Sequence, residues 1–292
     1  MGDRSSINTD ELKSRMDDLF ILTSQVQYGD KHPLRIVQAS KSLIGINLES
    51  PPKVLLKWLE YYMQDFIPDF NLQFLNIEEA SPEIITFIHF KNLILKKKAV
   101  ESHIYLSYLL QVAGVTQIAE YLVELGVSKS PSSLLFCWSA LRSIQFLGEK
   151  DGSLILNHCI SKLLEDEECK IIDEVLYFEQ YEVYCHQFQI RKTDIVRKNK
   201  IIPHLDKMIL AIDRELIKIR PQIMPINLCS IIQIEGEKGI ISFLATLKVE
   251  EITADLILML DAVRSLLKFS DDPKDPFLLH ILNNHKEKAC VK

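Results

Sequence analysis

The stretch SPPKVLLKWLEYYMQDF, residues 50–66, shows the pattern that decides the fold of this chain. Its apolar residues recur at intervals of three and four, which places them on one face of an α-helix: Leu55, Trp58, Leu59, Tyr62 and Phe66. Ser50 followed by Pro51 is typical of a helix start, because a serine side chain caps free N–H groups and proline has no N–H to leave unsatisfied. We therefore expect a helix that begins at Pro51, with Ser50 as its N-cap.

The same spacing recurs along most of the chain. It predicts further helices over residues 8–29, 33–45, 117–125, 131–147, 154–168, 170–190, 205–219 and 252–267. Gly126 and Gly148 each follow one of these segments, and we expect them to end it, since glycine is a common helix terminator.

Two short features refine this pattern. The Ser-Pro start recurs at Ser81-Pro82 and at Ser130-Pro131, so these three starts divide the N-terminal half into helices of ordinary length. The run INLCSIIQI, residues 226–234, is rich in β-branched residues and is the best strand candidate in the chain. It is equally compatible with a turn of buried helix, because short apolar runs do not reveal their period.

Many helices joined by short loops, without alternating strands, predict an all-α fold. Two architectures fit, an irregular multi-helix bundle and an α-solenoid-like stack of helical hairpins. We expect residues 1–9 to form a flexible N-terminus, residues 10–150 an N-terminal helical lobe and residues 151–288 a C-terminal helical lobe, unless the two lobes form one continuous domain. The loop at 148–152 and the polar segment around 191–203 are the candidate boundaries.

The composition narrows the class of protein. With 292 residues, 47% hydrophobic and 25% charged, the chain can bury a large core. Nine glycines are few for this length, and neither G-x-G-x-x-G nor a P-loop string occurs, which argues against a nucleotide-binding α/β enzyme. A net charge of −6 does not by itself attract nucleic acid, so any basic binding surface must be local.

The cysteine pattern indicates a reducing compartment. The six cysteines form no C-x-x-C pair, and the N-terminus has no charged segment followed by an apolar one, as a secretory signal would have. No apolar run approaches the ~18 residues that cross a bilayer. We therefore expect an intracellular protein, cytoplasmic or nuclear, with reduced thiols at Cys137, Cys159, Cys169, Cys185, Cys229 and Cys290.

The stretch FSDDPKDPF, residues 269–277, contains the D-D-x-x-D spacing with which some helical enzymes hold magnesium and a diphosphate, formed by Asp271, Asp272 and Asp275. In such a site the aspartates converge from one face of a helix. Here Pro273 lies inside the motif and Pro276 follows it, and each proline disfavours helical backbone in the preceding residue. We interpret the motif as a turn after a helix that ends near Phe269.

The segment IIDEVLYFEQYEVYCHQFQI combines an aromatic stripe with a polar face that carries Glu179, Glu182 and His186. Two carboxylates and an imidazole could form half of a metal site, but di-iron bundles use Glu-x-x-His with a matching copy on another helix, which is missing here. We interpret the polar face as a solvated strip and the aromatic stripe, Tyr177, Tyr181, Tyr184 and Phe188, as core. We predict no metal ligand and no cofactor.

Neighbouring Cys and His residues do not form a catalytic pair. In His158-Cys159 and Cys185-His186 the two side chains diverge by about 100° around a helix, so neither pair can share a proton as a nucleophile and its base must. No H-E-x-x-H string and no G-x-S-x-G elbow is present. These absences favour a protein that is not an enzyme.

Two basic clusters remain, and the stronger is a candidate partner-binding patch. Lys96, Lys97 and Lys98 form the first. The second concentrates five positive charges in ten residues: Arg191, Lys192, Arg197, Lys198 and Lys200. Such a patch could meet an acidic protein, an import receptor or nucleic-acid phosphate, although no aromatic residues alternate with it as in single-strand binders.

These observations favour a non-enzymatic intracellular scaffold or adaptor that binds a protein partner. Two alternatives stay open. One is a helical-bundle enzyme acting on an isoprenoid or another hydrophobic substrate, with magnesium and diphosphate held at residues 271–275. The other is a nucleic-acid-associated factor that uses the patch at residues 191–200. The sequence predicts neither the partner nor the oligomeric state.

Overall fold

The computed structural model describes residues 9–29, 32–69, 82–165, 174–212 and 226–271. Over these ranges the chain is helical and has no strand, apart from an isolated β-bridge between Val26 and Pro68. The helices pack on one another as an irregular bundle, which confirms the prediction of an all-α fold.

The helices follow one another along the chain with short connections. Their bounds are α1 (Thr9–Gln25), α2 (Leu34–Ile44), α3 (Lys53–Met63), α4 (Phe87–Leu95), α5 (Ala99–Val112), α6 (Val115–Lys129), α7 (Pro131–Leu147), α8 (Glu149–Gly152), α9 (Ile155–Leu164), α10 (Glu174–Lys192), α11 (Lys198–Ala211), α13 (Ile226–Glu235), α14 (Lys238–Leu244), a 3₁₀ turn (Val249–Glu251) and α15 (Ala254–Phe269).

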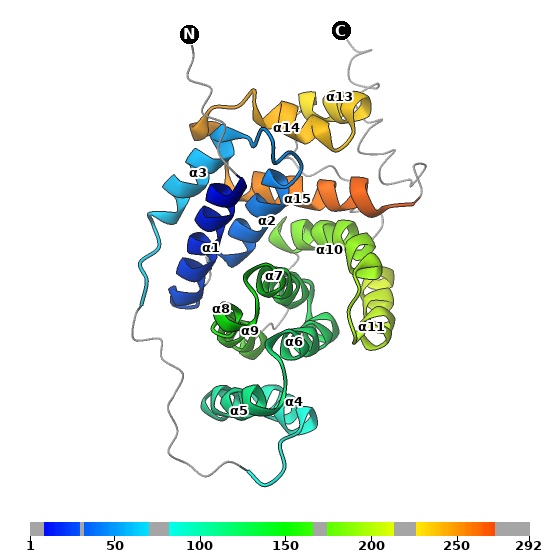
Figure 1. Ribbon diagram of the computed structural model, residues 1–292. Coiled ribbons are helices and arrows are strands. Elements are labelled where there is room, and N and C mark those ends of the chain that lie inside the picture. The colour runs from blue at the N-terminus through cyan, green and yellow to red at the C-terminus, as the bar shows by residue number, and fades with distance from the viewer. Residues whose placement is uncertain (1–8, 30–31, 70–81, 166–173, 213–225, 272–292) are drawn as a thin grey trace.

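Helix α7 lies at the centre of the bundle. It packs against α2, α6, α9 and α10, and α15 in turn packs against α2 and α10. Figure 1 shows α4 and α5 at one end of the molecule, where they pack on α6 and α9, and α13 and α14 at the opposite end. None of the described helices combines the length and the apolar character that crossing a membrane requires.

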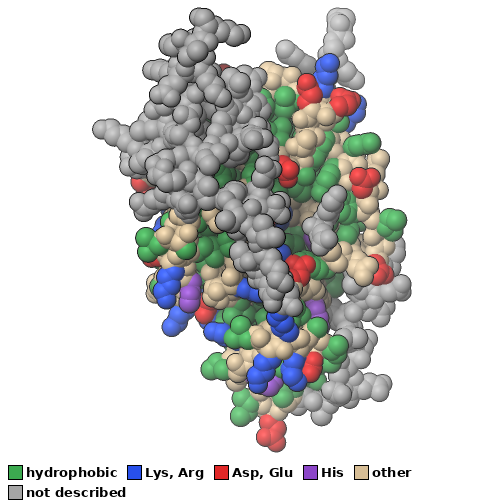
Figure 2. Space-filling model, turned by 180° about the vertical axis from the view of Figure 1, so that it is seen from behind, with side chains coloured by type: hydrophobic (Ala, Val, Ile, Leu, Met, Phe, Trp, Pro, Cys, Tyr) green, Lys and Arg blue, Asp and Glu red, His purple; other side chains and the backbone are tan. Residues whose placement is uncertain are grey.

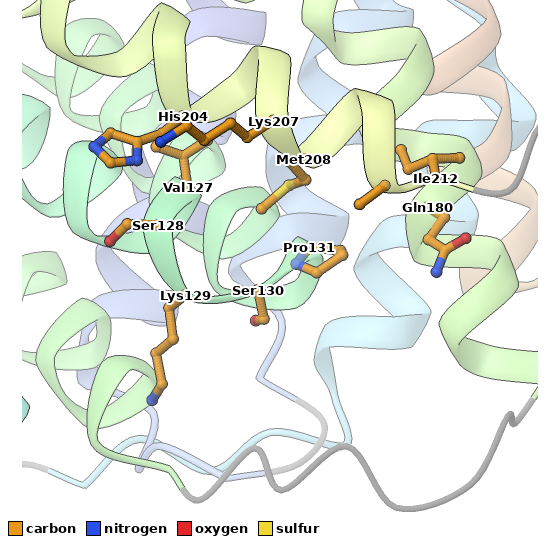
Figure 3. Close-up of a pocket in the computed structure, with 11 residues that line it drawn as sticks. Val127, Ser128, Lys129, Ser130, Pro131, Gln180, His204, Lys207, Met208 and Ile212 are labelled. Carbon is orange, nitrogen blue, oxygen red and sulfur yellow. The ribbon is translucent and has the colours of Figure 1, made fainter.

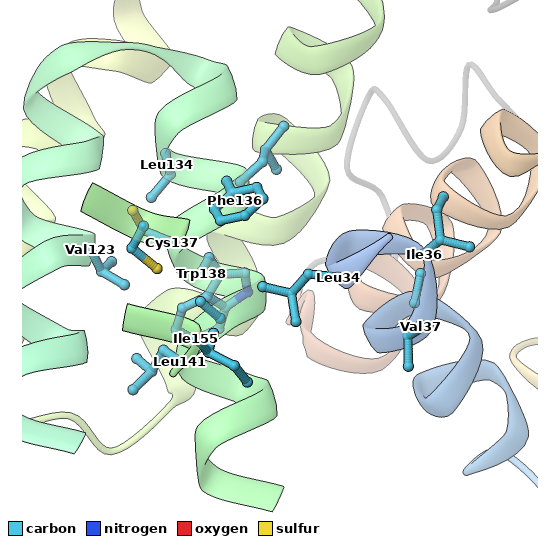
Figure 4. Packing of buried hydrophobic residues seen from close by; sticks show 14 of the residues in the cluster. Leu34, Ile36, Val37, Val123, Leu134, Phe136, Cys137, Trp138, Leu141 and Ile155 are labelled. Atoms are coloured by element: carbon cyan, nitrogen blue, oxygen red, sulfur yellow. The ribbon is translucent and has the colours of Figure 1, made fainter. Parts of the chain in front are cut away.

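The core forms because each helix turns its apolar stripe inward. Figure 4 shows Trp138 of α7 among side chains of other helices, including Val123 of α6, Ile155 of α9 and Leu34 of α2. The buried cluster continues from Leu12 in α1 to the end of α15. Burying apolar surface contributes about 25 cal/mol for each Å² removed from water, so this shared core is the main source of stability.

One of the three Ser-Pro starts is confirmed. Ser130 is the N-cap of α7 and accepts a hydrogen bond from the backbone N–H of Ser133 at 3.1 Å. Ser50 is not a cap, since α3 begins at Lys53 and the N–H of Ser50 donates to Asn47 Oδ1 at 3.2 Å. The Ser81-Pro82 prediction is also wrong, because Thr86 caps α4; Ser81 itself lies outside the described residues.

Three further predictions need correction. The candidate strand at 226–234 is helical and belongs to α13, so the alternative of buried helix holds. Gly148 ends α7 with a φ of 87°, as expected, but Gly126 lies inside α6. The loop at 148–152 contains the one-turn helix α8, and the polar segment at 191–203 is largely helical, since α10 ends at Lys192 and α11 begins at Lys198.

Candidate functional site

Helix α10 carries polar side chains that are buried, so the prediction of a solvated strip is wrong. Glu182 is 1% exposed and His186 is 5% exposed. Helices α2 and α15 cover this face and bring partners with them. Arg35 Nη2 donates to both carboxylate oxygens of Glu182, at 2.8 and 2.7 Å, and Arg35 Nη1 lies 3.7 Å from Glu179 Oε1. A buried carboxylate is tolerated only when it is paired in this way.

The low-polarity surroundings change the acidity of both groups. Burial raises the pKa of Glu182 to about 7, although the attraction of Arg35 acts in the opposite direction. Burial also lowers the pKa of His186 to about 4, so its imidazole is neutral at pH 7. The His186 ring is held by the Ser265 hydroxyl of α15, 2.9 Å from Nδ1. These contacts hold α10, α2 and α15 together.

The aromatic stripe of α10 contributes to packing, as predicted, where it is described. Tyr181 is buried in the core. Tyr184 and Phe188 are half-buried against the same cluster, with their rings edge to face at a centroid distance of 6.1 Å. The side chain of Tyr177 lies outside the described residues.

A second buried polar cluster joins α7 to α15. Arg142 Nη1 lies 3.1 Å from Asp261 Oδ2, and Arg142 also donates to the Ser42 hydroxyl of α2. Arg264 lies 3.6 Å from Asp261 and 3.2 Å from Glu237. Burial acts to raise the pKa of Asp261, but the two guanidiniums and His186 outweigh it, and the net pKa is lowered. Asp261 is therefore ionised.

The predicted basic patch is partly engaged within the fold. Arg191 lies 2.5 Å from Asp206, and Lys192 pairs with Asp271. Arg197 is bound most tightly: its guanidinium lies 2.6 Å from Glu124 and 4.6 Å from the centre of the Tyr121 ring, both on α6. Lys198 and Lys200 form no ion pair with any described residue. Partner binding by this patch stays a prediction.

The aspartate motif is described only at its first residue. Helix α15 ends at Phe269, as predicted, and the exposed Asp271 pairs with Lys192 rather than facing another carboxylate. Asp272 and Asp275 lie outside the described residues, as does the predicted turn. Within the ranges that the structure describes, no group of three or more His, Cys, Asp or Glu side chains could hold a metal ion.

The His and Cys neighbours are structural. His158 Nε2 lies 3.0 Å from the Ser24 carbonyl oxygen, which ties α9 to α1. Cys137, Cys159 and Cys185 are buried and form no disulfide with a described residue. Burial and the adjacent Cys137 raise the pKa of Cys159 well above its ordinary value, so the thiol is not an activated nucleophile.

Two clefts are lined in part by polar side chains. Figure 3 shows a cleft of about 390 Å³ where the α6–α7 junction faces α11, with His204 and Lys207 on α11 and Ser130 opposite them. No carboxylate or thiol is among the residues that line it. A second cleft, of about 460 Å³, is lined by Arg35 and Glu179, which pair with each other, and also by His32 and Asp255.

An exposed apolar surface on α4 is the feature that a partner would recognise most directly. We define the α4 surface as Ile84, Ile88, Leu95 and Val100, whose exposed fractions run from 61% to 75%. Ile88 and Leu95 are seven residues apart and therefore share one helix face, while Phe90, Leu93 and Ile94 turn the other face into the core. Ile84 precedes α4 and Val100 lies on α5. Exposed apolar residues gathered on one part of a surface can mark an interaction site.

Lysines border this apolar surface. Lys91 and Lys96 are exposed, and neither forms an ion pair with a described residue. Figure 2 shows green apolar and blue basic side chains side by side at the end of the molecule that α4 and α5 form. An apolar centre with a charged rim is the usual composition of a protein-binding surface.

No protein-family model, no curated protein and no solved structure matches this chain. The geometry of its own residues is therefore what supports a function.

Sequence reasoning found only part of this site. It identified Lys96, Lys97 and Lys98 as a basic cluster but did not connect them with the apolar residues nearby. The available signal was the sequence FIHFKNLIL, which is apolar on nearly all sides, since a helix with two apolar faces either lies deep in a core or binds a partner.

Proposed function

We propose that the protein is a non-enzymatic helical scaffold or adaptor, acting in the cytoplasm or nucleus, and that its α4 surface binds a partner protein. The observation that carries this proposal is the pair of apolar faces on α4, one packed and one open to solvent. Each exposed isoleucine or leucine offers about 1.5–3 kcal/mol if a partner buries it fully. The buried cysteines, which form no disulfide with a described residue, support a reducing compartment.

The chemistry of the surface favours an acidic amphipathic helix as the partner. The seven-residue spacing of Ile88 and Leu95 matches the repeat of a helix packed along α4. Lys91 and Lys96 then face the rim of that helix, where carboxylates would complement them. Because the chain as a whole carries a net charge of −6, this local positive end also determines the direction from which an acidic partner approaches.

The test is affinity capture with matched variants. The wild type, the variant Ile88→Ser/Leu95→Ser and the control Val196→Ser/Leu210→Ser are tagged and compared by quantitative mass spectrometry. The control removes two other highly exposed apolar side chains, on or beside α11. We expect one protein to be retained by the wild type and by the control and lost by the α4 variant. Equal retention by all three proteins would overturn the proposal.

The charged rim is tested separately on the purified pair. We expect Lys91→Glu/Lys96→Glu to slow association and to weaken its dependence on salt, because rim charges act mainly on the association rate. The control, Lys198→Glu/Lys200→Glu, reverses two charges of the patch at residues 191–200. If the control weakens binding and the α4 charge variant does not, that patch is the interface and the α4 surface is not.

A further inference from the structure

A cavity of about 340 Å³ lies where α2, α7, α10 and α15 meet. Three of the side chains that line it are cationic: Lys41, Arg142 and Arg264. Gln189 of α10 and Thr193, which follows α10, add neutral polar groups to the wall. No carboxylate is among the lining residues. The cavity therefore presents donors and positive charge to whatever occupies it.

The buried carboxylates behind the cavity do not balance these cations. Asp261 is shared between Arg142 and Arg264, and Glu237 lies 3.2 Å from Arg264. Of the three cations that line the cavity, Lys41 forms no ion pair with a described carboxylate. An uncompensated charge in a buried site is costly unless a ligand of opposite charge pairs with it.

Arg264 has unused hydrogen-bonding capacity in this place. Its side chain is 9% exposed, and neither Nε nor Nη1 has a hydrogen-bond partner. The nearby carboxylates of Glu237 and Asp261 attract it without hydrogen-bond geometry. Glu237 Oε1 and Asp261 Oδ1 are likewise without a hydrogen-bond partner, so charge attraction holds these groups together and the guanidinium keeps donors for a further acceptor.

The pKa of Lys41 is also affected by the positive charges around it. Its ammonium lies 4.7 Å from the centre of the Phe146 ring, at the edge of the cavity. Burial and then the charge of Arg142 lower the pKa of Lys41 to about 8, with Arg264 acting in the same direction and Asp261 against it. An anion among the three cations would relieve this repulsion.

We propose that this cavity binds a phosphate group between Arg142, Arg264 and Lys41. Two guanidiniums and an ammonium offer several N–H donors, and a phosphate has more oxygens to accept them than a carboxylate has. The volume exceeds that of inorganic phosphate, which leaves room for the organic part of a small phosphomonoester. Such a ligand would join α2 and α7 to α10 and α15 and stabilise their packing.

The experiment measures thermal unfolding and binding heat with two probes, inorganic phosphate and glycerol phosphate, against chloride at equal ionic strength. The variant is Lys41→Gln, and the control is Lys13→Gln, because Lys13 lies over the same Phe146 ring at 5.6 Å but does not line the cavity. Phosphate also stabilises proteins through exclusion from their surface, so the difference between the variants is the deciding quantity.

We expect saturable binding by the wild type and by Lys13→Gln, with at least a tenfold higher Kd for Lys41→Gln. A tighter Kd for glycerol phosphate would assign the rest of the cavity to an organic group, and equal Kd values would identify free phosphate as the ligand. No saturable binding to the wild type, or the same Kd in Lys41→Gln, would overturn the proposal.

Discussion

Arg142 on α7 and Asp261 on α15 lie 119 positions apart in the sequence and form a buried ion pair of 3.1 Å. Helix α15 comes late in the sequence, yet it packs near the centre of the bundle, where α7 lies. The pair therefore ties the C-terminal half of the described chain to its central helix.

The first prediction concerns the cost of breaking this pair. Asp261→Asn leaves two guanidiniums without their shared carboxylate, and we expect it to lower the free energy of unfolding by about 3–5 kcal/mol. The double variant Arg142→Met/Asp261→Leu removes both charges and should cost less than the sum of its two single changes. Urea unfolding of the wild type, Asp261→Asn, Arg142→Met, Asp261→Leu and the double variant checks this. Strictly additive costs would show that the two charges do not interact.

The second prediction concerns the stability of the protein at acidic pH. Burial lowers the pKa of His186 to about 4, below the ordinary 6.5, so protonation favours the unfolded chain. The stability that depends on neutral His186 is complete above pH 6.5 and is lost as the pH falls towards 4. By pH 5 the wild type should lose about 2 kcal/mol more than His186→Asn, relative to each protein at pH 8.

The ionisation of Glu182 changes stability with pH in the opposite direction, and its effect must be separated from that of His186. Burial raises its pKa from 4.5 to about 7, so its contribution is complete below pH 4.5 and is lost as the pH rises through 7. The wild type and His186→Asn both keep Glu182, so comparing their stabilities at each pH removes this contribution. If the two stability profiles run parallel between pH 8 and pH 5, His186 is not buried in its neutral form.

The helices could be predicted because their signal is local. An apolar stripe needs only residues three and four apart, and helix α7 also has its cap and its first proline next to each other at Ser130 and Pro131. The prediction that Ser50 caps α3 is wrong for a physical reason. A proline disfavours helical backbone in the residue before it. Because residues 51 and 52 are both prolines, this effect acts on Ser50 and again on Pro51, and α3 starts only at Lys53.

The third prediction tests that difference. Ser130→Ala removes the acceptor for the N–H of Ser133, and we expect a loss of about 1 kcal/mol in the free energy of unfolding. Ser50→Ala removes no cap and should change stability by less than about 0.5 kcal/mol. Thermal and urea unfolding measure both. Equal losses would mean that Ser50 caps α3 after all.

The polar interior could not be predicted, because its partners are remote in the sequence. The face of α10 that carries Glu182 looks like a solvated strip until Arg35, 147 positions earlier, is placed against it. The sequence does contain one signal, a single charge within an apolar helix, which is Arg142 in PSSLLFCWSALRSIQFL. It indicates a buried pair but not the identity of the partner.

The fourth prediction concerns Gly126, which resembles a helix stop in the sequence but lies inside α6. A Cβ at this position would come 2.8 Å from the Ser133 carbonyl oxygen, so the glycine permits α6 and α7 to approach closely. We expect Gly126→Ala to destabilise the protein by about 1–2 kcal/mol, although alanine is the better helix former. Gly29→Ala, where a Cβ would meet nothing within 4 Å, is the control. A stabilised Gly126→Ala variant would exclude the close contact.

The fifth prediction concerns Lys97, which has a φ of 54° and ends α4 in the left-handed conformation. The N–H of Lys98 donates to the Leu93 carbonyl at 3.0 Å and that of Lys97 to Ile94 at 3.0 Å, which is the Schellman arrangement that glycine normally occupies. Lys97→Gly should therefore raise the free energy of unfolding by about 0.5–1 kcal/mol.

Lys96→Gly is the matched control, because Lys96 has a φ of −84° and gains nothing from glycine. A loss of stability in Lys97→Gly would mean that the lysine side chain contributes more than its strained backbone costs. Lys97→Gly could instead gain stability while capture of the partner falls. That result would mean that Lys97 contacts the partner, because the fold alone favours glycine at this position. Unchanged capture would place Lys97 outside the contact and leave Lys91 and Lys96 as the lysines that border the α4 surface.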